Sequence, residues 1–380
     1  MADKLSKTGM KDVVAAETRL SRVDGMAGEL TIAGFSLDEF AEKATFEETV
    51  YLLWHDALPT PHQLSEFTDA LTSRRPLSTA TLDLLRAASK QHIPTIDALR
   101  MGASTLSLGQ AESTDSSRDD ALRLVSALPT IAAAYWRLKG GNAPVDPDPD
   151  LGHAANYLYM LTGEPPGHQR SRAMETYLNT IVDHGLNAST FTARVITSTR
   201  SDMISSITGA LGALKGPLHG GAPGPALDMV LEIGKKENIE PYLRAKLERG
   251  ERLMGFGHAV YKVRDPRADV LAEAARRFYE SGGDRDLYEL AMEVERKAVE
   301  LLEAYKPGRN LQTNVEFYTA LLLHGLELPT ELFTPTFALG RVAGWTAHCF
   351  EQKALDQIIR PKSVYRGAND RKWVPADERC

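Results

Sequence analysis

The chain has 380 residues, of which 43% are hydrophobic and 25% are charged, and its formal net charge is −7. This balance is typical of a folded globular protein and excludes disorder over most of the chain. The negative charge argues against a nucleic-acid-binding protein, and an anionic ligand would have to be held by local cations. At about 150 residues per domain, the length favours two linked lobes.

The first predicted element is a short β-hairpin, and the elements after it are helices. Asp24-Gly25 is a typical hairpin turn, and Glu29–Ile32 alternates polar with apolar residues. Gln169–Val182 and Leu287–Tyr305 place apolar residues at helical spacing. Proline and glycine mark the breaks, and the most linker-like stretch is Ala143–Leu151. We therefore predict an all-α protein with a small N-terminal β-hairpin.

The cysteines and histidines give no sign of a disulfide framework or a metal site. Cys349 and Cys380 are the only two cysteines, and we expect Cys349, beside His348 on an apolar run, to be a buried, inert thiol. Asp183-His184 lacks companion ligands at suitable spacing, and no His-Glu-x-x-His occurs. Since neither a signal peptide nor a membrane-spanning run is visible, we expect a cytoplasmic protein.

The segment at 216–221, Gly-Pro-Leu-His-Gly-Gly, departs from a plain amphipathic helix. Glycines beside His219 would let the backbone approach a ligand closely and would hold the imidazole on a tight turn. The alternative is an interdomain loop whose histidine is merely solvated.

A second segment combines Gly-Phe-Gly-His at 255–258 with Asp-Pro-Arg at 265–267. Its glycines free the backbone around His258, and Arg267 could grip a carboxylate through two parallel hydrogen bonds. Alternatively, Asp265 caps a helix that begins at Pro266. The two interpretations are compatible, because a capped helix start would fix Arg267 in place.

A third segment places Glu316 among Val315, Phe317 and Tyr318. Burial there would raise the pKa of the carboxyl and suit a general base. Taken alone, a helix first turn in which Glu complements the dipole is the favoured alternative. Arg341 and Arg360 lie farther along, and neither stands out by itself.

Five blocks in register together resemble the citrate synthase family. They are Asp-His through Asn-Ala-Ser-Thr between 183 and 190, Gly-Pro-Leu-His-Gly-Gly at 216–221, Gly-Phe-Gly-His at 255–258 with Asp-Pro-Arg at 265–267, Asn-Val-Glu-Phe-Tyr at 314–318, and Arg-Pro-Lys-Ser at 360–363. The chain is similar to the short bacterial and archaeal type of this family.

The resemblance implies a mostly helical homodimer whose subunits each have two domains. Residues 1–221 and 327–380 would form the large, dimer-forming domain, and residues 222–326 the small domain that closes over the active site. The implied activity is that of an acyltransferase of the tricarboxylic acid cycle, with oxaloacetate and acetyl-CoA as substrates. No metal, permanent cofactor, nucleic acid or membrane is expected.

Catalytic roles follow from the resemblance, residue by residue. Glu316 would be the general base that removes a proton from the methyl group of acetyl-CoA. His219 would donate a hydrogen bond to the thioester oxygen as it becomes an enolate, and His258 would polarise the ketone of oxaloacetate.

Binding roles are implied in the same way. The carboxylates of oxaloacetate would be held by His184, Arg267, Arg341 and, from the partner subunit, Arg360. Weaker candidates for contacts with coenzyme A or its acetyl group are Lys262, Asn314 and Phe337.

The sequence departs from the family pattern at two positions and leaves three functions open. Most members have Asp at the place of Glu316, and Asn is common at the place of Pro223. The leading hypothesis is citrate synthase. The runner-up is 2-methylcitrate synthase using propionyl-CoA, because one methylene discriminates weakly. A non-catalytic paralogue that binds a CoA ester or a dicarboxylate is the third.

Overall fold

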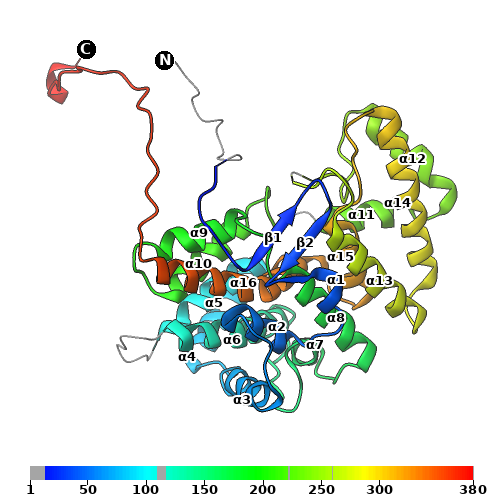
Figure 1. The fold of residues 1–380 in the computed structure, drawn as a ribbon, viewed down its shortest axis with the longest axis horizontal. Coiled ribbons are helices and arrows are strands. Elements are labelled where there is room, and N and C mark those ends of the chain that lie inside the picture. Colours follow the sequence, from blue (N-terminus) through cyan, green and yellow to red (C-terminus); the bar gives the residue numbers. More distant parts are fainter. Residues whose placement is uncertain (1–12, 109–116, 221–222, 259, 380) are drawn as a thin grey trace.

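The fold is a bundle of helices with one small sheet, which is formed by residues near the N-terminus of the chain (Figure 1). The computed structural model describes residues 13–108, 117–220, 223–258 and 260–379. Within these ranges lie sixteen α-helices and a single three-stranded sheet. The predicted all-α class with a small hairpin is therefore confirmed. The predicted domain boundary between residues 221 and 222 lies outside the described residues, as do Cys380 and the first twelve residues.

The sheet is antiparallel, in the order β1-β2-β3. β1 (Ser21–Asp24) pairs with β2 (Glu29–Ile32), with Ser21 opposite Ile32, and β2 pairs with β3 (Phe35–Ser36). Leu30 and Ile32 are buried, whereas Glu29 is exposed, as the alternation of the sequence predicts.

Ten helices precede the motif at 216–221. They are α1 (Leu37–Phe40), α2 (Phe46–His55), α3 (Pro61–Thr72), α4 (Thr79–Ser89), α5 (Thr95–Ser104), α6 (Ser117–Lys139), α7 (His153–Thr162), α8 (His168–Ile181), α9 (Ala188–Thr197) and α10 (Met203–Leu214). The linker-like stretch at 143–151 joins α6 to α7, which pack on each other, so it separates no domains. Arg75 donates to the carbonyls of Asp148 and Leu151 and fixes this connection.

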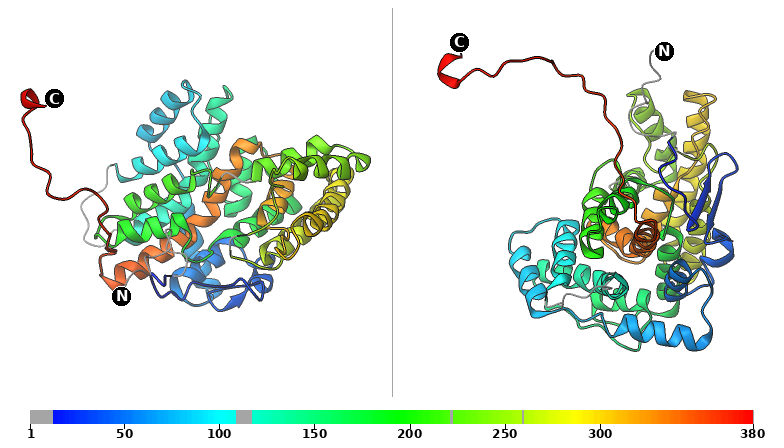
Figure 2. Two further views of the ribbon diagram at one scale, coloured as in Figure 1. Left: turned by 90° about the horizontal axis from the view of Figure 1, so that it is seen from above. Right: turned by 60° about the vertical axis from the view of Figure 1, so that its left-hand side comes forward.

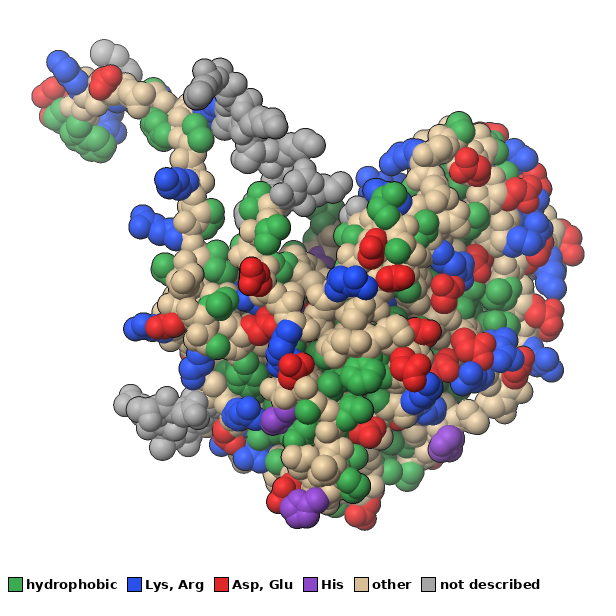
Figure 3. Space-filling view, in the orientation of Figure 1, with side chains coloured by type: hydrophobic (Ala, Val, Ile, Leu, Met, Phe, Trp, Pro, Cys, Tyr) green, Lys and Arg blue, Asp and Glu red, His purple; other side chains and the backbone are tan. Residues whose placement is uncertain are grey.

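Five helices after the motif pack mainly against one another. They are α11 (Pro223–Ile233), α12 (Ile239–Glu248), α13 (Pro266–Glu280), α14 (Arg285–Tyr305) and α15 (Val315–Gly325). The outer end formed by α12 and α14 carries intermingled acidic and basic side chains (Figure 3). Many are paired, as Arg296 is with Glu293 and Lys297 with Glu240.

α16 (Phe333–Leu355) runs through the centre of the molecule and is buried over most of its length. Such an all-round apolar helix belongs in a core. Gly340 and Gly344 let it lie directly against the end of α8, because a Cβ at Gly344 would be 2.2 Å from the carbonyl oxygen of Val182. This close approach sets Arg341, between the two glycines, beside the segment that carries His184.

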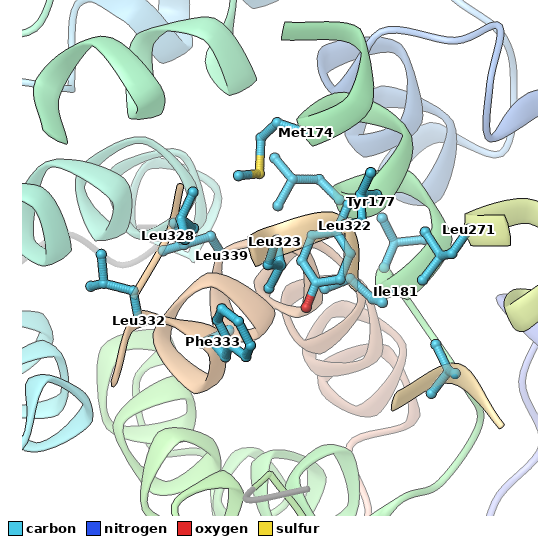
Figure 4. Close-up of a cluster of buried hydrophobic side chains, with 14 of the residues drawn as sticks. Met174, Tyr177, Ile181, Leu271, Leu322, Leu323, Leu328, Leu332, Phe333 and Leu339 are labelled. Atoms are coloured by element: carbon cyan, nitrogen blue, oxygen red, sulfur yellow. The ribbon is translucent and has the colours of Figure 1, made fainter. Parts of the chain in front are cut away.

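One hydrophobic cluster joins the helices that carry the candidate site residues (Figure 4). It holds α8, α13, α15 and α16 against one another, and its members include Met174, Tyr177, Ile181, Leu271, Leu322, Leu323, Phe333 and Leu339. Burying a large aliphatic or aromatic side chain contributes about 1.5–3 kcal/mol, so the cluster fixes these four helices firmly.

The chain beyond α16 leaves the folded body (Figures 1 and 2). Residues 360–379 are exposed throughout, with only a short 3-10 turn at Ala376–Glu378. Several of its apolar side chains are more than 60% exposed: Ile358, Val364, Tyr365 and Trp373. A segment with this much uncovered apolar surface is typical of one that packs on another chain.

Candidate active site

A cavity of about 940 Å³ collects most of the residues singled out in the sequence. Eight of the ten predicted site residues line it: His184, His219, His258, Arg267, Asn314, Glu316, Phe337 and Arg341. They come from five stretches of chain separated by tens of residues: 184, 219, 258–267, 314–316 and 337–341. Four of the five blocks recognised in the sequence are therefore brought together in space, whereas the block at 360–363 is not part of the cavity lining.

Glu316 lies in the first turn of α15, whose N-cap is Asn314. The Asn314 Oδ1 atom accepts a hydrogen bond from the Glu316 N–H (2.9 Å), and its Nδ2 donates to the Gly257 carbonyl (2.8 Å). The Asn314 N–H also donates to the Gly255 carbonyl (3.0 Å). Asn314 thereby ties the segment of Glu316 to the segment of His258. Glu316 stands in a helix first turn, as one interpretation predicts, and it also lines the cavity, where the role of general base stays a prediction.

Gly255 lies where the segment of His258 meets the start of α15, and this position requires glycine. Its φ is +86°, and a Cβ there would lie 2.9 Å from the Cβ of Phe317. A side chain would therefore be strained in its backbone and would also clash with α15.

The carboxyl of Glu316 has an unusual proton affinity. Burial raises its pKa to about 7, although the positive charge of Arg267 acts in the opposite direction. A carboxylate that titrates near neutral pH suits a general base, because it is available in the ionised form and still holds a proton well.

His258 is held in one tautomer by its own loop. Its Nδ1 atom accepts hydrogen bonds from the backbone N–H groups of Val260 (3.0 Å) and Tyr261 (3.1 Å). The neutral ring must then carry its proton on Nε2, which lies 3.4 Å from Nη2 of Arg267. Burial and the charge of Arg267 lower the pKa of His258 to about 4. The Nε2–H group of His258 and the Nη2 group of Arg267 are thus two hydrogen-bond donors that lie close together in the cavity lining.

Arg267 is fixed by a buried carboxylate that the sequence analysis treated only as a helix cap. Asp265 does cap α13, which begins at Pro266, but it also accepts from Nε (3.1 Å) and Nη2 (2.8 Å) of Arg267. Its Oδ2 atom further accepts from the Val315 N–H (3.2 Å). Burial would raise the pKa of Asp265, but the charge and hydrogen bonds of Arg267 lower it. Asp265 thus joins the starts of α13 and α15.

His219 reaches the cavity from the loop after α10. Its Nε2 atom lies 2.7 Å from Oγ of Ser189, which also accepts a hydrogen bond from the indole N–H of Trp345 (3.1 Å). The Ser189 hydroxyl has a second acceptor in reach, Oδ1 of Asn187 (2.8 Å). Burial and the charge of Arg341 lower the pKa of His219 to about 4, so its ring is neutral at pH 7.

His184 and Arg341 form the inner wall. The Nε2 atom of His184 lies 3.0 Å from the Tyr261 hydroxyl, and burial together with Arg267 holds its pKa well below the ordinary range. Arg341 donates from Nε to the Ile181 carbonyl (2.6 Å), and its guanidinium lies 4.6 Å from the ring centroid of Phe337. Burial lowers the pKa of Arg341 to about 10, so it remains a cation at neutral pH.

Two predicted residues lie away from these walls. The side chain of Lys262 is exposed and is not part of the cavity lining. Arg360 is exposed in the segment that leaves the body after α16. Pro223 begins α11, and its side chain lies outside what the structure describes.

The cavity also has walls that the sequence analysis did not single out. Three basic side chains line it: Arg252, Lys306 and Arg309. Ser21 and Val23 of β1 line it as well. Lys306 and Arg309 belong to a Pro-Gly break between helices, which is only a weak sequence signal for a binding site. Ser21 carries no such signal, because only tertiary contacts bring β1 to the cavity.

Three other features bear on function. Among the side chains that the structure describes, no group of three or more His, Cys, Asp or Glu residues could hold a metal ion. Cys349 is buried, and burial raises the pKa of its thiol to about 11, as an inert thiol requires. In the described part of the chain, no helix combines the length and apolar character that crossing a membrane requires.

Comparison with known proteins agrees with this geometry. The family model described as "Citrate synthase, C-terminal domain" matches residues 9–362. The citrate synthase of Haloferax volcanii is 39% identical, covering 98% of this chain and 99% of that protein. The 2-methylcitrate synthase of Shewanella oneidensis is 37% identical, covering 100% and 99%.

A solved structure is similar over nearly its whole length. It is the ternary complex of carboxymethyl coenzyme A and oxaloacetate with citrate synthase from Thermoplasma acidophilum, with a TM-score of 0.87 and 30% sequence identity, covering 98% of each chain. The family model, the relatives and the structural match each cover nearly the complete sequence. The chain therefore belongs to the citrate synthase family of transferase enzymes.

Proposed function

We propose that this protein condenses acetyl-CoA with oxaloacetate to give citrate and CoA. One observation carries the proposal: a single cavity is lined by Glu316, whose carboxyl has a pKa of about 7, by the neutral His219 and His258, and by the buried Arg267 and Arg341. The arrangement provides a base for a weakly acidic C–H bond, donors for two developing oxyanions and cations for a dicarboxylate.

The reaction begins at the acyl group. Glu316 removes a proton from the carbon next to the thioester. When the Ser189 hydroxyl donates its hydrogen bond to Nε2 of His219, the neutral ring carries its proton on Nδ1 and donates a hydrogen bond from there to the enolate oxygen. His258, with its proton on Nε2, donates to the ketone oxygen of oxaloacetate. One such donor contributes about 3–4 kcal/mol to the transition state. The enolate carbon then attacks the ketone carbon, and hydrolysis of the citryl thioester releases CoA.

Oxaloacetate is a dianion, and its carboxylates need cations inside the cavity. His184, Arg267 and Arg341 supply donors there, each charge-assisted hydrogen bond contributing about 1.5–3 kcal/mol. Local cations thus outweigh the net charge of −7.

The phosphates of CoA also need cations, and we assign them to Arg252, Lys306 and Arg309, which line the cavity. Phe337 packs near the acyl group. Asn314 acts mainly through its backbone contacts, because both ends of its amide are already engaged. Lys262 remains a candidate for an outer contact with CoA.

Helices α11–α15 would form the lobe that closes over this cavity, in line with the small domain predicted for residues 222–326. Closure would exclude water during the condensation, and reopening would readmit water for the hydrolysis. Arg267 lies in α13 and Glu316 in α15, so closure would bring the arginine that binds a carboxylate and the base to the substrate at the same time.

The exposed segment at 360–379 is the basis for proposing a homodimer in which Arg360 serves the active site of the partner subunit. If so, Arg360→Ala and Arg267→Ala subunits should each have impaired oxaloacetate binding, and mixing them should restore activity. In a one-to-one mixture about half the dimers are mixed and one site in each is complete, so about a quarter of the sites should work. An absence of activity in purified mixed dimers would contradict a shared site.

The proposed reaction is tested by thiol release from acetyl-CoA, measured with and without oxaloacetate. We expect release that depends on oxaloacetate, with citrate as product. No release from acetyl-CoA or propionyl-CoA would overturn the enzymatic proposal and would favour a non-catalytic paralogue that binds one of these ligands.

The second candidate is 2-methylcitrate synthase, because relatives with that name are as similar in sequence as several named citrate synthase. The two differ by one methylene of the acyl group, worth only about 1–3 kcal/mol of discrimination. The ratio of kcat/KM for propionyl-CoA to that for acetyl-CoA decides between them, and a ratio above one selects the second candidate.

The pKa of Glu316 predicts the acid limb of the pH profile. The active form is the carboxylate, so kcat/KM for the acyl-CoA should rise with pH and level off above about pH 7. The histidines, whose pKa values lie near 4, stay neutral across this range. An acid limb near pH 4.5, measured at saturating oxaloacetate, would contradict a base with a raised pKa.

A further inference from the structure

The N-terminal hairpin reaches both of the segments that carry the oxaloacetate-facing histidines. β1 begins at Ser21, which lines the cavity beside His184 and Gly185. The turn that follows β1 begins at Gly25, which contacts the segment 260–262, just beyond His258. Four residues of extended chain cover about 13 Å, which is the distance that β1 bridges between the two contacts.

At the start of the strand, Ser21 brackets His184. Its hydroxyl donates to the Asp183 carboxylate, and its Oγ atom accepts from the Gly185 N–H (2.9 Å). The other oxygen of Asp183 lies 3.1 Å from Nε2 of the buried His348. The residues on either side of His184 are thus anchored through a single side chain of β1.

At the end of the strand, Gly25 fits against the loop of His258. Its carbonyl accepts from the Lys262 N–H (2.7 Å), and a Cβ at Gly25 would lie 2.4 Å from the Val260 carbonyl oxygen. Gly25 is not among the glycines with positive φ, so its backbone would accept alanine. The close approach itself is what excludes a side chain.

The two segments held by β1 also meet inside the cavity. Tyr261 donates its backbone N–H to Nδ1 of His258, and its hydroxyl lies 3.0 Å from Nε2 of His184. The two imidazole rings are 5.7 Å apart between centroids. A shift of either segment would therefore change the spacing of the groups that face oxaloacetate.

We propose that β1 is a positioning element of the oxaloacetate subsite, in which Ser21 and Gly25 together set the spacing between His184 and His258. This inference rests on the proposed function only for the name of the ligand. Ser21 and Gly25 act through the histidines, so they are positioning residues. Their effect should fall on the dicarboxylate and not on the acyl-CoA.

The test compares KM for oxaloacetate with KM for the acyl-CoA in Ser21→Ala and Gly25→Ala. A misplacement of about 1 Å at a reacting group costs up to ~10²-fold, so we expect KM for oxaloacetate to rise about tenfold in each variant. KM for the acyl-CoA should rise much less than KM for oxaloacetate, and within about twofold in Ser21→Ala, because the hydroxyl of Ser21 bonds Asp183 and Gly185 and no residue assigned to CoA. Ser21→Thr, which keeps the hydroxyl, should restore the wild-type value.

Two matched variants separate positioning from general destabilisation. Met26→Ala changes a side chain that is 76% exposed in the same turn, and Ser89→Ala removes a buried serine hydroxyl in α4, far along the chain from the hairpin. Both should leave the two KM values unchanged. An equal rise of both KM values in Ser21→Ala and Gly25→Ala, or no rise in either, would overturn the proposal.

Calorimetric titration with oxaloacetate alone keeps this proposal distinct from the proposed reaction. If the wild type releases no thiol but binds oxaloacetate, the reaction is wrong and the positioning role is still measured by the Kd of each variant. A Kd of Ser21→Ala and Gly25→Ala equal to that of the wild type would refute the role of β1.

Discussion

Replacing Glu316 by Gln is expected to lower kcat by about 10²–10⁴-fold while leaving KM for oxaloacetate nearly unchanged. General base catalysis contributes this much, and an amide of the same shape cannot accept the proton. The measurement is steady-state thiol release at saturating concentrations of both substrates. Glu316→Asp is the matched control, because it keeps a carboxylate and should retain more activity than the Gln variant even though the group is withdrawn by one methylene.

Stability measurements show whether such a loss reflects chemistry or unfolding. The pKa of Glu316 is about 7 in the folded protein and near 4.5 when unfolded, so folding favours the protonated form. Its favourable contribution is complete below about pH 4.5 and is lost as the pH rises through 7. Glu316→Gln lacks this penalty and should therefore unfold at an equal or higher temperature than the wild type at pH 8. A lower Tm at pH 8, together with the loss of activity, would point to misfolding.

Replacing Arg267 by Gln is expected to weaken oxaloacetate binding and also to destabilise the fold. Arg267 and Asp265 are both buried, and the variant leaves the Asp265 carboxylate without its partner. Removing one member of a buried ion pair typically costs 3–5 kcal/mol. We expect kcat/KM for oxaloacetate to fall by about 10²-fold or more, and the free energy of unfolding in urea to fall by about 3 kcal/mol.

A double variant separates the two effects. Asp265→Asn with Arg267→Gln removes both charges and keeps a side chain that can cap α13. We expect it to recover much of the lost stability and none of the lost oxaloacetate binding. If binding returned together with stability, Arg267 would act only by holding the fold and not by contacting the substrate.

Local patterns in the sequence were sufficient for much of the fold. The helices predicted at 169–182 and 287–305 are α8 and α14, with ends displaced by only one or two residues. The Asp24-Gly25 turn and the Asp265 cap were predicted because each depends on neighbouring residues alone. The order of the helices in space, which decides what faces the cavity, has no such local signal.

The parts of the site that the sequence could not predict depend on contacts between distant residues. Ser189 and Trp345, which hold His219 in place, are 156 residues apart. The link from Asp265 to the first N–H of α15 spans 50 residues, and that from Ser21 to Asp183 spans 162. Ordinary serines and aspartates carry no pattern that marks such roles, so only the folded chain identifies them.

The central claim is that Glu316 takes the proton from the carbon next to the thioester, and proton exchange measures this step alone. Acetyl-CoA is incubated with the enzyme in D₂O and malate, a dicarboxylate that has no ketone to attack, and deuterium in the acetyl group is followed by mass spectrometry. We expect exchange with the wild type and exchange at least about 10²-fold slower with Glu316→Gln. Equal exchange rates in the two proteins would contradict the role of Glu316 as the base.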